Sequence, residues 1–483
     1  MTLDMPNDRI LIGGRWQAAA SGESIPLFDP STGEQISAVG RGGAGDIDAA
    51  VAAARAALAD EWGAATATER GRALARLGAL VAAHADELAE LEARDVGKPL
   101  SQARTDALAL ARYMEFYGAA ADKLHGETIP FGEGYTVYTL RQPHGVTGHI
   151  IPWNYPMQII GRSVGAALAA GNAVVLKPAE EACLTALAFA RLAEQAGLPA
   201  GALNVVTGFG EEAGAALAAH PGVDHLSFTG SVGVGAQVQA AAAANVAPVT
   251  LELGGKSPQI VFADADLERA LPFLVGAGIQ NAGQTCSAAS RLLVERAVYD
   301  RLLDRLAERY RTLRAAPALE DRDLGPLVSA RQKEIVEGFH ARAEADGLTV
   351  VARGEIAAGA PAGGHYMAPV LYGDVPPEHA LAQDEVFGPV QVVIPFEGEA
   401  EAIRLANSTP YGLVAGVWTS DGGRQMRLAR AIRAGQVFLN DYGAGGGVEL
   451  PFGGVGRSGH GREKGFEALY GFTTLKTVAA WHG

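Results

Sequence analysis

Cys286 is the residue of this chain whose side chain could do covalent chemistry most directly. It is one of two cysteines among 483 residues and lies in the segment GQTCSAASR, residues 283–291. Small neighbours leave a sulfur approachable, as a nucleophile requires. A solitary thiol in an intracellular protein is more often a small buried hydrophobic residue, so the cysteine alone leaves both interpretations open.

Two polar residues upstream of Cys286 stand in surroundings suited to catalysis. Asn154 lies in the apolar, proline-stiffened segment IPWNYP, residues 151–156, where a fixed amide N–H could stabilise an oxyanion. Glu252 is a single acid at the end of an apolar run, where burial would raise its pKa toward that of a general base. The alternatives are a turn asparagine and a carboxylate bonded to backbone amides.

Two glycine-rich turns could hold a phosphate group. GFGEEA, residues 208–213, fits the pattern G-x-G-x-x-[GA], and GSVGVG, residues 230–235, has the same setting between strand and helix without that spacing. Glu211 and Glu212 would repel a pyrophosphate from the first turn, whereas the second offers backbone donors and a hydroxyl. Either segment could also be only a tight turn.

The segment KPAE, residues 177–180, ends a predicted buried strand with a cation and a carboxylate. A carboxylate in the place of Glu180 can accept hydrogen bonds from both hydroxyls of an adenosine ribose, and it would repel a 2'-phosphate. The segment therefore favours NAD over NADP. A solvated ion pair between Lys177 and Glu180 on a loop is the alternative.

Predicted elements place these residues at the ends of strands. A hairpin is expected in the opening segment, then helices over about 46–60 and from the capping box at 66–69 to about 97. From about 145 to 252 short apolar runs alternate with helical ones, which predicts a parallel sheet that binds nucleotides at the carboxyl ends of its strands. The predicted strands are 146–151, 173–177, 202–207, 225–229 and 248–253.

A second alternating region from 257 to about 440 predicts another α/β domain, with the join near residues 254–256. Its expected elements include strands at 259–262, 291–294, 390–395 and 416–419 and a helix over 298–314. Extended segments within 125–142 and 475–481 fall outside both domains. We expect these two isolated strands to pair with another subunit, because exposed single strands are unstable.

Composition excludes several classes of protein. A formal net charge of -15 argues against a nucleic-acid partner, which needs a basic surface. The two cysteines form no disulfide framework and no zinc-ligand spacing. Residues 1–8 lack the apolar core of a signal peptide, and the longest apolar run, 164–176, is too short for a membrane span. We therefore expect a soluble cytoplasmic protein without membrane or nucleic-acid partners.

Together these motifs resemble the aldehyde dehydrogenase superfamily, and the resemblance runs from Ile10 to the C-terminus. Seven pieces carry it in order: 152–156, 177–180, 228–231 with Gly235, 251–256, 283–286, 385–389 and 451–454. The resemblance implies an α/β fold with two doubly wound parallel-sheet domains, one Rossmann-like for the cofactor and one catalytic, plus a small β oligomerisation domain. The implied boundaries are 1–124 with 143–253 (NAD-binding), 254–455 (catalytic), and 125–142 with 456–483 (bridging).

The resemblance also assigns roles. Cys286 is the expected nucleophile, Asn154 and the backbone N–H of Cys286 form the expected oxyanion site, and Glu252 is the expected general base for hydrolysis of a thioester. The implied NAD-binding residues are Ile151, Trp153, Lys177, Glu180, Gly210, Gly230, Ser231, Leu253, Glu385 and Phe387. The implied substrate residues are Tyr155, Arg162, Thr285, Ser287 and Tyr442.

The substrate stays open at this point. Arg162 could clamp a substrate carboxylate, or it could pair with a protein acid such as Glu449. The glycine-rich segment 440–449 suggests a roomy tunnel, which suits a bulky or aromatic aldehyde as well as a semialdehyde. Acylation of coenzyme A and a non-catalytic binding protein are the alternative functions, and the presence of Glu252 favours hydrolysis. The bridging strands imply a homodimer or a dimer of dimers.

Overall fold

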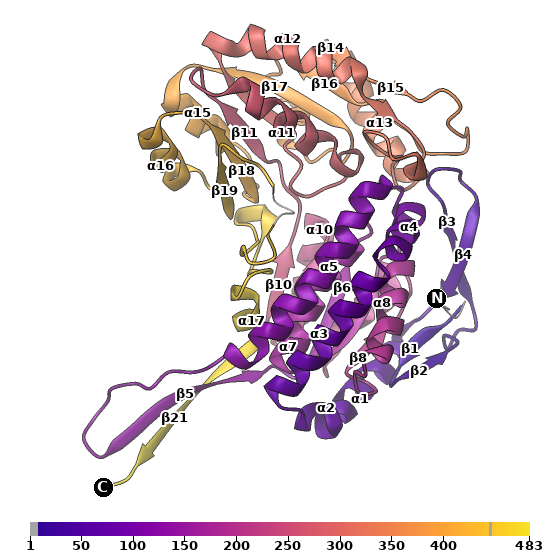
Figure 1. The fold of residues 1–483 in the computed structure, drawn as a ribbon, viewed down its shortest axis with the longest axis vertical. Coiled ribbons are helices and arrows are strands. Elements are labelled where there is room, and N and C mark those ends of the chain that lie inside the picture. The colour runs from indigo at the N-terminus through magenta and orange to yellow at the C-terminus, as the bar shows by residue number, and fades with distance from the viewer. Residues whose placement is uncertain (1–7, 444–446) are drawn as a thin grey trace.

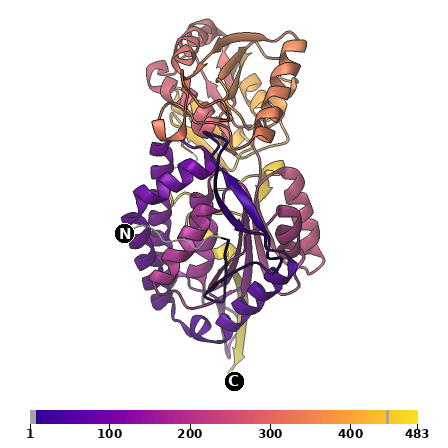
Figure 2. The same ribbon diagram turned by 90° about the vertical axis from the view of Figure 1, so that its right-hand side faces the viewer.

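The computed structural model describes residues 8–443 and 447–483. The chain forms two lobes, each built around a sheet, and a long two-stranded arm that projects from the first lobe (Figure 1). Figure 2 shows the same lobes stacked one above the other, with the arm directed away from the second lobe. The two α/β units and the separate β arm confirm the predicted fold class, whereas the exact domain boundaries stay a prediction.

The sheet of the first lobe has eight strands within the described residues, and its five central strands are parallel as expected. Its outer strands β2, β1 and β20 run antiparallel to their neighbours. In spatial order the strands are β2 (Arg15–Gln17), β1 (Ile10–Ile12), β8 (Leu203–Val205), β7 (Ala173–Pro178), β6 (Val146–Ile151), β9 (His225–Thr229), β10 (Val249–Glu252) and β20 (Gly459–His460).

The helices of the first lobe differ from the prediction at residues 66–97, and the long helix α5 (Leu100–Ala120) was not predicted. The capping box at Thr66 and Glu69 is present, but the expected single helix over 66–97 is wrong, since it ends and restarts at His84. His84 has φ -106° and ψ 17°, and its ring nitrogen contacts Glu87 of the next helix at 3.0 Å. These helices are α1 (Ala44–Ala59), α2 (Glu61–Ala64), α3 (Ala67–Ala83), α4 (Ala85–Val96), α5 (Leu100–Ala120), α6 (Pro156–Ile159), α7 (Gly165–Ala170), α8 (Leu184–Gln195), α9 (Ala215–Ala219) and α10 (Val232–Ala243).

The sheet of the second lobe has seven strands in the described residues, six of them parallel. The four predicted strands form its centre. In spatial order the sheet is β14 (Thr349–Arg353), β16 (Val370–Gly373), β17 (Val390–Phe396), β12 (Arg291–Glu295), β11 (Pro258–Val261), β18 (Val414–Trp418) and β19 (Gln436–Leu439). Its helices are α11 (Leu267–Ile279), α12 (Arg296–Thr312), α13 (Ala330–Ala345), α14 (Ala380–Gln383), α15 (Gly398–Ala406) and α16 (Gly422–Ala431).

The arm consists of β5 (Tyr135–Pro143) and β21 (Thr473–Trp481), which lie side by side in an antiparallel register from Thr473 opposite Pro143 to Trp481 opposite Tyr135. The expectation of two isolated strands is therefore wrong, because each strand satisfies one edge of the other. Short remaining elements are β3 (Ser24–Phe28), β4 (Gln35–Gly40), β13 (Arg314–Ala315), β15 (Glu355–Ile356) and α17 (Glu467–Gly471). Across the described residues, no helix has the length and apolarity to cross a bilayer.

Candidate active site

A cavity of about 330 Å³ gathers most of the predicted site residues. Cys286 and Glu252 both line it, although they come from different lobes of the fold. Glu252 is the last residue of β10, at the carboxyl end where ligands bind in open parallel sheets, whereas Cys286 lies in the loop that precedes β12. The predicted site residues in its wall are Trp153, Asn154, Tyr155, Arg162, Gly230, Ser231, Glu252, Leu253, Thr285, Cys286, Ser287, Glu385 and Phe387.

Five predicted residues are not among the described residues of the cavity wall. Ile151 is buried at the end of β6, and Lys177 near the end of β7 pairs with Glu180 at 2.9 Å. Gly210 starts a short turn before α9, where an added Cβ would contact nothing. Tyr442 is buried behind the cysteine loop, and its hydroxyl donates to the Ser287 carbonyl. In the glycine-rich segment 440–449, residues 444–446 lie outside the described residues.

The loop that carries Cys286 begins with three residues in left-handed backbone conformations. Asn281, Ala282 and Gly283 have φ angles of 49°, 54° and 75°. A Cβ on Gly283 would lie 2.0 Å from the Gly388 carbonyl oxygen, so only glycine fits there. Strain of this kind persists only where the surroundings fix the backbone. The loop is therefore held from outside rather than by its own preferences.

Hydrogen bonds from buried side-chain amides fix the backbone of this loop. The Asn154 amide donates to the Gln284 carbonyl at 2.9 Å, and the Asn281 amide donates to the Asn154 carbonyl at 3.0 Å. Gln284 in turn donates to the Asn281 carbonyl and accepts from the Val328 N–H. An asparagine amide has two N–H groups, so Asn154 keeps a second donor for the cavity that it lines. Asn281 was missed in the sequence, where an asparagine without periodic neighbours gives no signal.

Glu252 is buried at the end of β10, and in the described residues neither carboxylate oxygen has a hydrogen-bond partner. Burial raises its pKa well above the usual value, the negative charge of Glu463 adds to the shift, and Arg162 opposes it. A Cβ at Gly453 would lie 2.7 Å from Oε1, so glycine keeps the space beside this carboxyl open. The alternative of a carboxylate bonded to backbone amides does not apply.

The Cys286 side chain is partly buried in the cavity wall. Its desolvation raises the pKa of the thiol to about 12, and the positive charge of Arg162 acts in the opposite direction. The backbone N–H of Ser287 also favours the thiolate. In the protein alone the thiol is thus mostly protonated, and a base or a positive charge must assist its ionisation.

Arg162 forms a buried ion pair, but not with the predicted partner. Its Nε lies 2.5 Å from Oε2 of Glu463, whose Oε1 accepts a hydrogen bond from the Ser227 hydroxyl at 2.7 Å. The expected partner Glu449 is wrong, because that carboxylate pairs with Arg112 at the surface. Glu463 was missed, since it lies in the short polar segment GREKG, residues 461–465, which gives no periodic signal. Its pairing occupies one side of the guanidinium that could otherwise bind a substrate carboxylate.

A second group of residues lines the same cavity. Glu385 accepts the Gly255 N–H at 3.0 Å, and burial raises its pKa to about 7. A Cβ at Gly254 would lie 2.2 Å from its Oε2, so the carboxylate depends on glycine for its place. Phe387, with φ 56°, meets the Trp153 ring edge to face at 5.4 Å between centroids. These side chains could receive the ribose and ring of a nucleotide.

The two glycine-rich turns differ as their charges suggested. Glu212 forms an ion pair with Arg41 through both of its oxygens, and a Cβ at Gly208 would lie 2.4 Å from the Gly42 carbonyl. Close packing against Gly42 therefore explains why the first residue of that turn is glycine. At the second turn the Ser231 hydroxyl caps α10, and a Cβ at Gly233 would contact nothing, so its helix N-terminus is open to an anion.

Comparison with known proteins agrees with this geometry. The family model described as "Aldehyde dehydrogenase family" matches residues 16–478. The mitochondrial benzaldehyde dehydrogenase of Antirrhinum majus is 43% identical over 98% of this chain and 88% of its own length. A crystal structure of a putative aldehyde dehydrogenase from Burkholderia cenocepacia superposes with a TM-score of 0.97 and 65% identity, covering 98% of this chain and 100% of that one.

A further solved structure was determined with a nucleotide. The NAD+ complex of an aldehyde dehydrogenase from Bacillus cereus has a TM-score of 0.96 and 39% identity, over 99% of this chain and 97% of that chain. Sequence and fold thus match these proteins over nearly the whole chain, including the parts that build the cavity. A thiol, an amide and a buried carboxyl without a hydrogen-bond partner among the described residues share one cavity, and the family model matches residues 16–478, so the chain is a member of the aldehyde dehydrogenase family.

Proposed function

We propose that this protein oxidises an aldehyde to a carboxylic acid through a thioester on Cys286, with NAD as the cofactor. The observation that carries the proposal is the meeting of Cys286, Glu252 and Asn154 in the wall of one cavity, although they are up to 132 positions apart in sequence. The buried carboxyl without a hydrogen-bond partner is costly to keep, and such groups concentrate at functional sites.

The chain's own groups account for the covalent steps. The Cys286 thiolate adds to the aldehyde carbon, and its sulfur–carbon bond forms while the carbonyl oxygen becomes an oxyanion. The second amide N–H of Asn154 and the backbone N–H of Cys286 donate to that oxyanion. NAD, when bound, accepts the hydride that leaves the same carbon. Glu252 then takes a proton from water, whose oxygen bonds to the thioester carbon while the carbon–sulfur bond breaks, which releases the acid and restores the Cys286 thiolate.

The residues present fit a nicotinamide dinucleotide. The open N-terminus of α10 suits a pyrophosphate, and the Glu385 carboxyl suits a ribose in the cavity. Lys177 and Glu180 suit the adenosine ribose, and the carboxylate of Glu180 would repel a 2'-phosphate. We therefore propose a preference for NAD over NADP. Comparing kcat/KM for the two cofactors tests it, and a ratio of NADP to NAD above one contradicts the role of Glu180.

For the substrate we propose a bulky or aromatic neutral aldehyde. Tyr155, Ile159 and Phe452 give the wall large apolar surfaces, which such a ring can contact. A semialdehyde is the second candidate, because Arg162 lines the cavity, but its pairing with Glu463 counts against it. The name of the Antirrhinum relative, a benzaldehyde dehydrogenase, supports the aromatic class. A panel of neutral aromatic, long aliphatic and carboxylated aldehydes ranks these classes by kcat/KM.

The reaction type has a direct test. Purified protein with NAD and an aldehyde is expected to produce NADH absorbance without coenzyme A, because Glu252 supplies a base for hydrolysis. Cys286→Ala is expected to abolish the signal. If NADH formed only when coenzyme A was present, an acylating enzyme would be the correct assignment. If no aldehyde gave NADH with either acceptor, the protein would be a binding protein that keeps the fold.

We also propose a cytoplasmic homodimer or dimer of dimers. The arm exposes large apolar side chains, among them Tyr135, Leu140, Leu475 and Trp481, which are between 39% and 65% exposed in the single chain. Exposed apolar surface of this kind marks an interface. Light scattering after gel filtration is expected to give twice or four times the chain mass, and a monomer would contradict the proposal.

A further inference from the structure

Tyr442 lies behind the cysteine loop and holds it. Its hydroxyl donates to the Ser287 carbonyl oxygen at 2.6 Å, and its side chain is only 8% exposed. The ring belongs to a small apolar cluster against which Cys286 packs, and a Cβ at Gly416 would lie 2.9 Å from it. The tyrosine therefore has little freedom to move, and its hydrogen bond fixes the residue that follows the cysteine.

The two peptide units that follow Cys286 are held in place. Toward the first lobe, a Cβ at Gly255 would lie 2.4 Å from the Cys286 carbonyl oxygen, so the loop backbone rests directly on a glycine. On the other side the Ser287 carbonyl is held by Tyr442. The N–H of Ser287 favours the thiolate of Cys286. Fixing the carbonyl of Ser287 restricts the rotation of that residue and thus the direction of its N–H.

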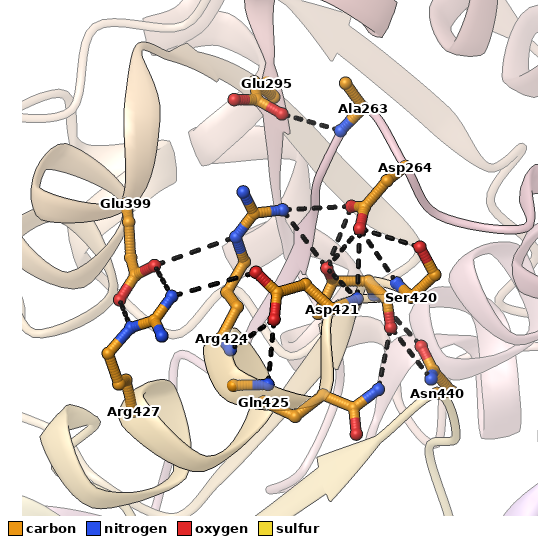
Figure 3. Close-up of polar contacts among 12 residues, drawn as sticks. Ala263, Asp264, Glu295, Glu399, Ser420, Asp421, Arg424, Gln425, Arg427 and Asn440 are labelled. Atoms are coloured by element: carbon orange, nitrogen blue, oxygen red, sulfur yellow. Dashed lines mark hydrogen bonds and ion pairs between the residues drawn. The ribbon is translucent and has the colours of Figure 1, made fainter.

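Tyr442 is itself anchored to the sheet of the second lobe. Asn440, two residues earlier, forms two hydrogen bonds with the backbone of Thr419. Its amide oxygen accepts from the Thr419 N–H and its amide nitrogen donates to the Thr419 carbonyl, each at 3.0 Å. The Thr419 hydroxyl in turn donates to the carboxylate of Asp264, which also accepts from the Ser420 hydroxyl (Figure 3). Asn440 has φ 52°, a left-handed conformation that redirects the chain after β19. A network of polar contacts thus determines where Tyr442 lies.

We propose that Tyr442 is a positioning residue, which orients the peptide units that follow Cys286 from an anchor at Asn440 and Asp264. It acts through Ser287 rather than by contact with the aldehyde. Tyr442 is not among the described residues that line the cavity. In this it differs from the other residues that were expected to contact the substrate, which do line it. The inference rests on the proposed function, in which Cys286 is the nucleophile.

The test measures the thiol without aldehyde or cofactor. Iodoacetamide alkylates Cys286 as the thiolate, and the other thiol, Cys183, is fully buried and donates to the Ala179 carbonyl. Tyr442→Phe is expected to slow alkylation roughly two- to tenfold at pH 8, the factor that one hydrogen bond contributes. Its rate profile should shift to higher pH. With substrate, kcat should fall while KM for the aldehyde stays within about twofold.

Tyr366→Phe is the matched control. The Tyr366 hydroxyl donates to the Ser31 carbonyl at 2.7 Å and Tyr366 is also buried, so the variant loses the same kind of bond at a residue that is not in the cavity wall. Its alkylation rate should equal that of the wild type. Asn440→Gly, which keeps the left-handed backbone but removes the amide, should slow alkylation in the same direction and serves if Tyr442→Phe does not fold. Cys286→Ala gives the background rate.

Three results overturn the inference. The first is that iodoacetamide alkylates Tyr442→Phe at the wild-type rate. The second is that Tyr366→Phe is alkylated as slowly as Tyr442→Phe, which would indicate a general loss of stability. A change confined to KM for the aldehyde would make Tyr442 a substrate contact. If instead the wild type oxidised no aldehyde but the alkylation rates differed as expected, the proposed function would fail and the positioning role would stand.

Discussion

Replacing Arg162 with methionine separates the two roles that its position allows. The guanidinium is buried, lies 2.5 Å from Glu463 and donates to the Thr229 hydroxyl at 3.2 Å. The substitution keeps most of the apolar stem and leaves the Glu463 carboxylate buried without its partner. Breaking a buried ion pair in this way costs about 3–5 kcal/mol. We expect the free energy of unfolding to fall by that amount.

Arg162→Met should also slow the reaction, because it removes a positive charge that acts on Cys286 and Glu252. Arg162 lowers the pKa values of Cys286 and Glu252, so its loss raises both. Each pKa unit reduces the thiolate fraction about tenfold at a pH well below the pKa. We expect kcat/KM near pH 8 to fall about tenfold or more for neutral and carboxylated aldehydes alike, and the pH profile to move upward.

The assay compares a neutral aldehyde with a carboxylated aldehyde of equal chain length, together with urea unfolding. Arg162→Met combined with Glu463→Gln should recover part of the lost stability, because the unpaired charge is then removed. A loss of kcat/KM confined to the carboxylated aldehyde, with a stability change below about 1 kcal/mol, would refute the argument from the ion pair. It would restore Arg162 as a substrate clamp.

Three further predictions concern the base, the cofactor and the core. Glu252→Gln should lower the steady-state rate about 10²- to 10⁴-fold while a first burst of NADH remains, and a lost burst would place Glu252 before the thioester. Glu180→Gln should raise the ratio of kcat/KM with NADP to kcat/KM with NAD. An unchanged ratio would indicate that the Lys177–Glu180 ion pair has only a structural role. Burial lowers the pKa of His149 to about 3 and that of His225 well below its usual value. Unfolding lets both bind protons, so the stability present above about pH 6.5 is lost as the pH falls. At pH 5 the loss from His149 is about 2 kcal/mol, and His225→Gln should reduce the total loss in urea titrations.

Much of the fold could be predicted because buried parallel strands are continuous apolar runs. Strands β6 and β9 have the predicted bounds, and the other central strands of both sheets differ from prediction by one or two residues at one or both ends. The strands β14, β16 and β19 were missed, since they lie toward the edges of the second sheet and carry weaker patterns. The break at His84 was missed because the apolar periodicity continues through it, although Asp86 and Glu87 mark a new helix start.

The site could be predicted in its residue types but not in its contacts. Motif spacing indicated Cys286, Asn154 and Glu252, and the structure brings them to one cavity. Which acid pairs with Arg162 depends on how residues 451–472 return to the first sheet, and no local pattern encodes that path. From the sequence we therefore expected Glu449, which lies beside the motif at residues 451–454, as the partner of Arg162. In the structure the partner is Glu463.

The contact of Gly283 with the Gly388 carbonyl has a consequence for engineering this protein. With no side chain between them, the backbone that leads to the thiol and the backbone beside Phe387 form one wall. A larger residue at Gly283 would shift the wall beside Cys286 and the wall beside Phe387 together, so under the proposed function selection for a new substrate there would carry a penalty in cofactor use. Tyr155 and Phe452 line the cavity without this coupling. Libraries that widen the range of aldehydes should begin at those two positions.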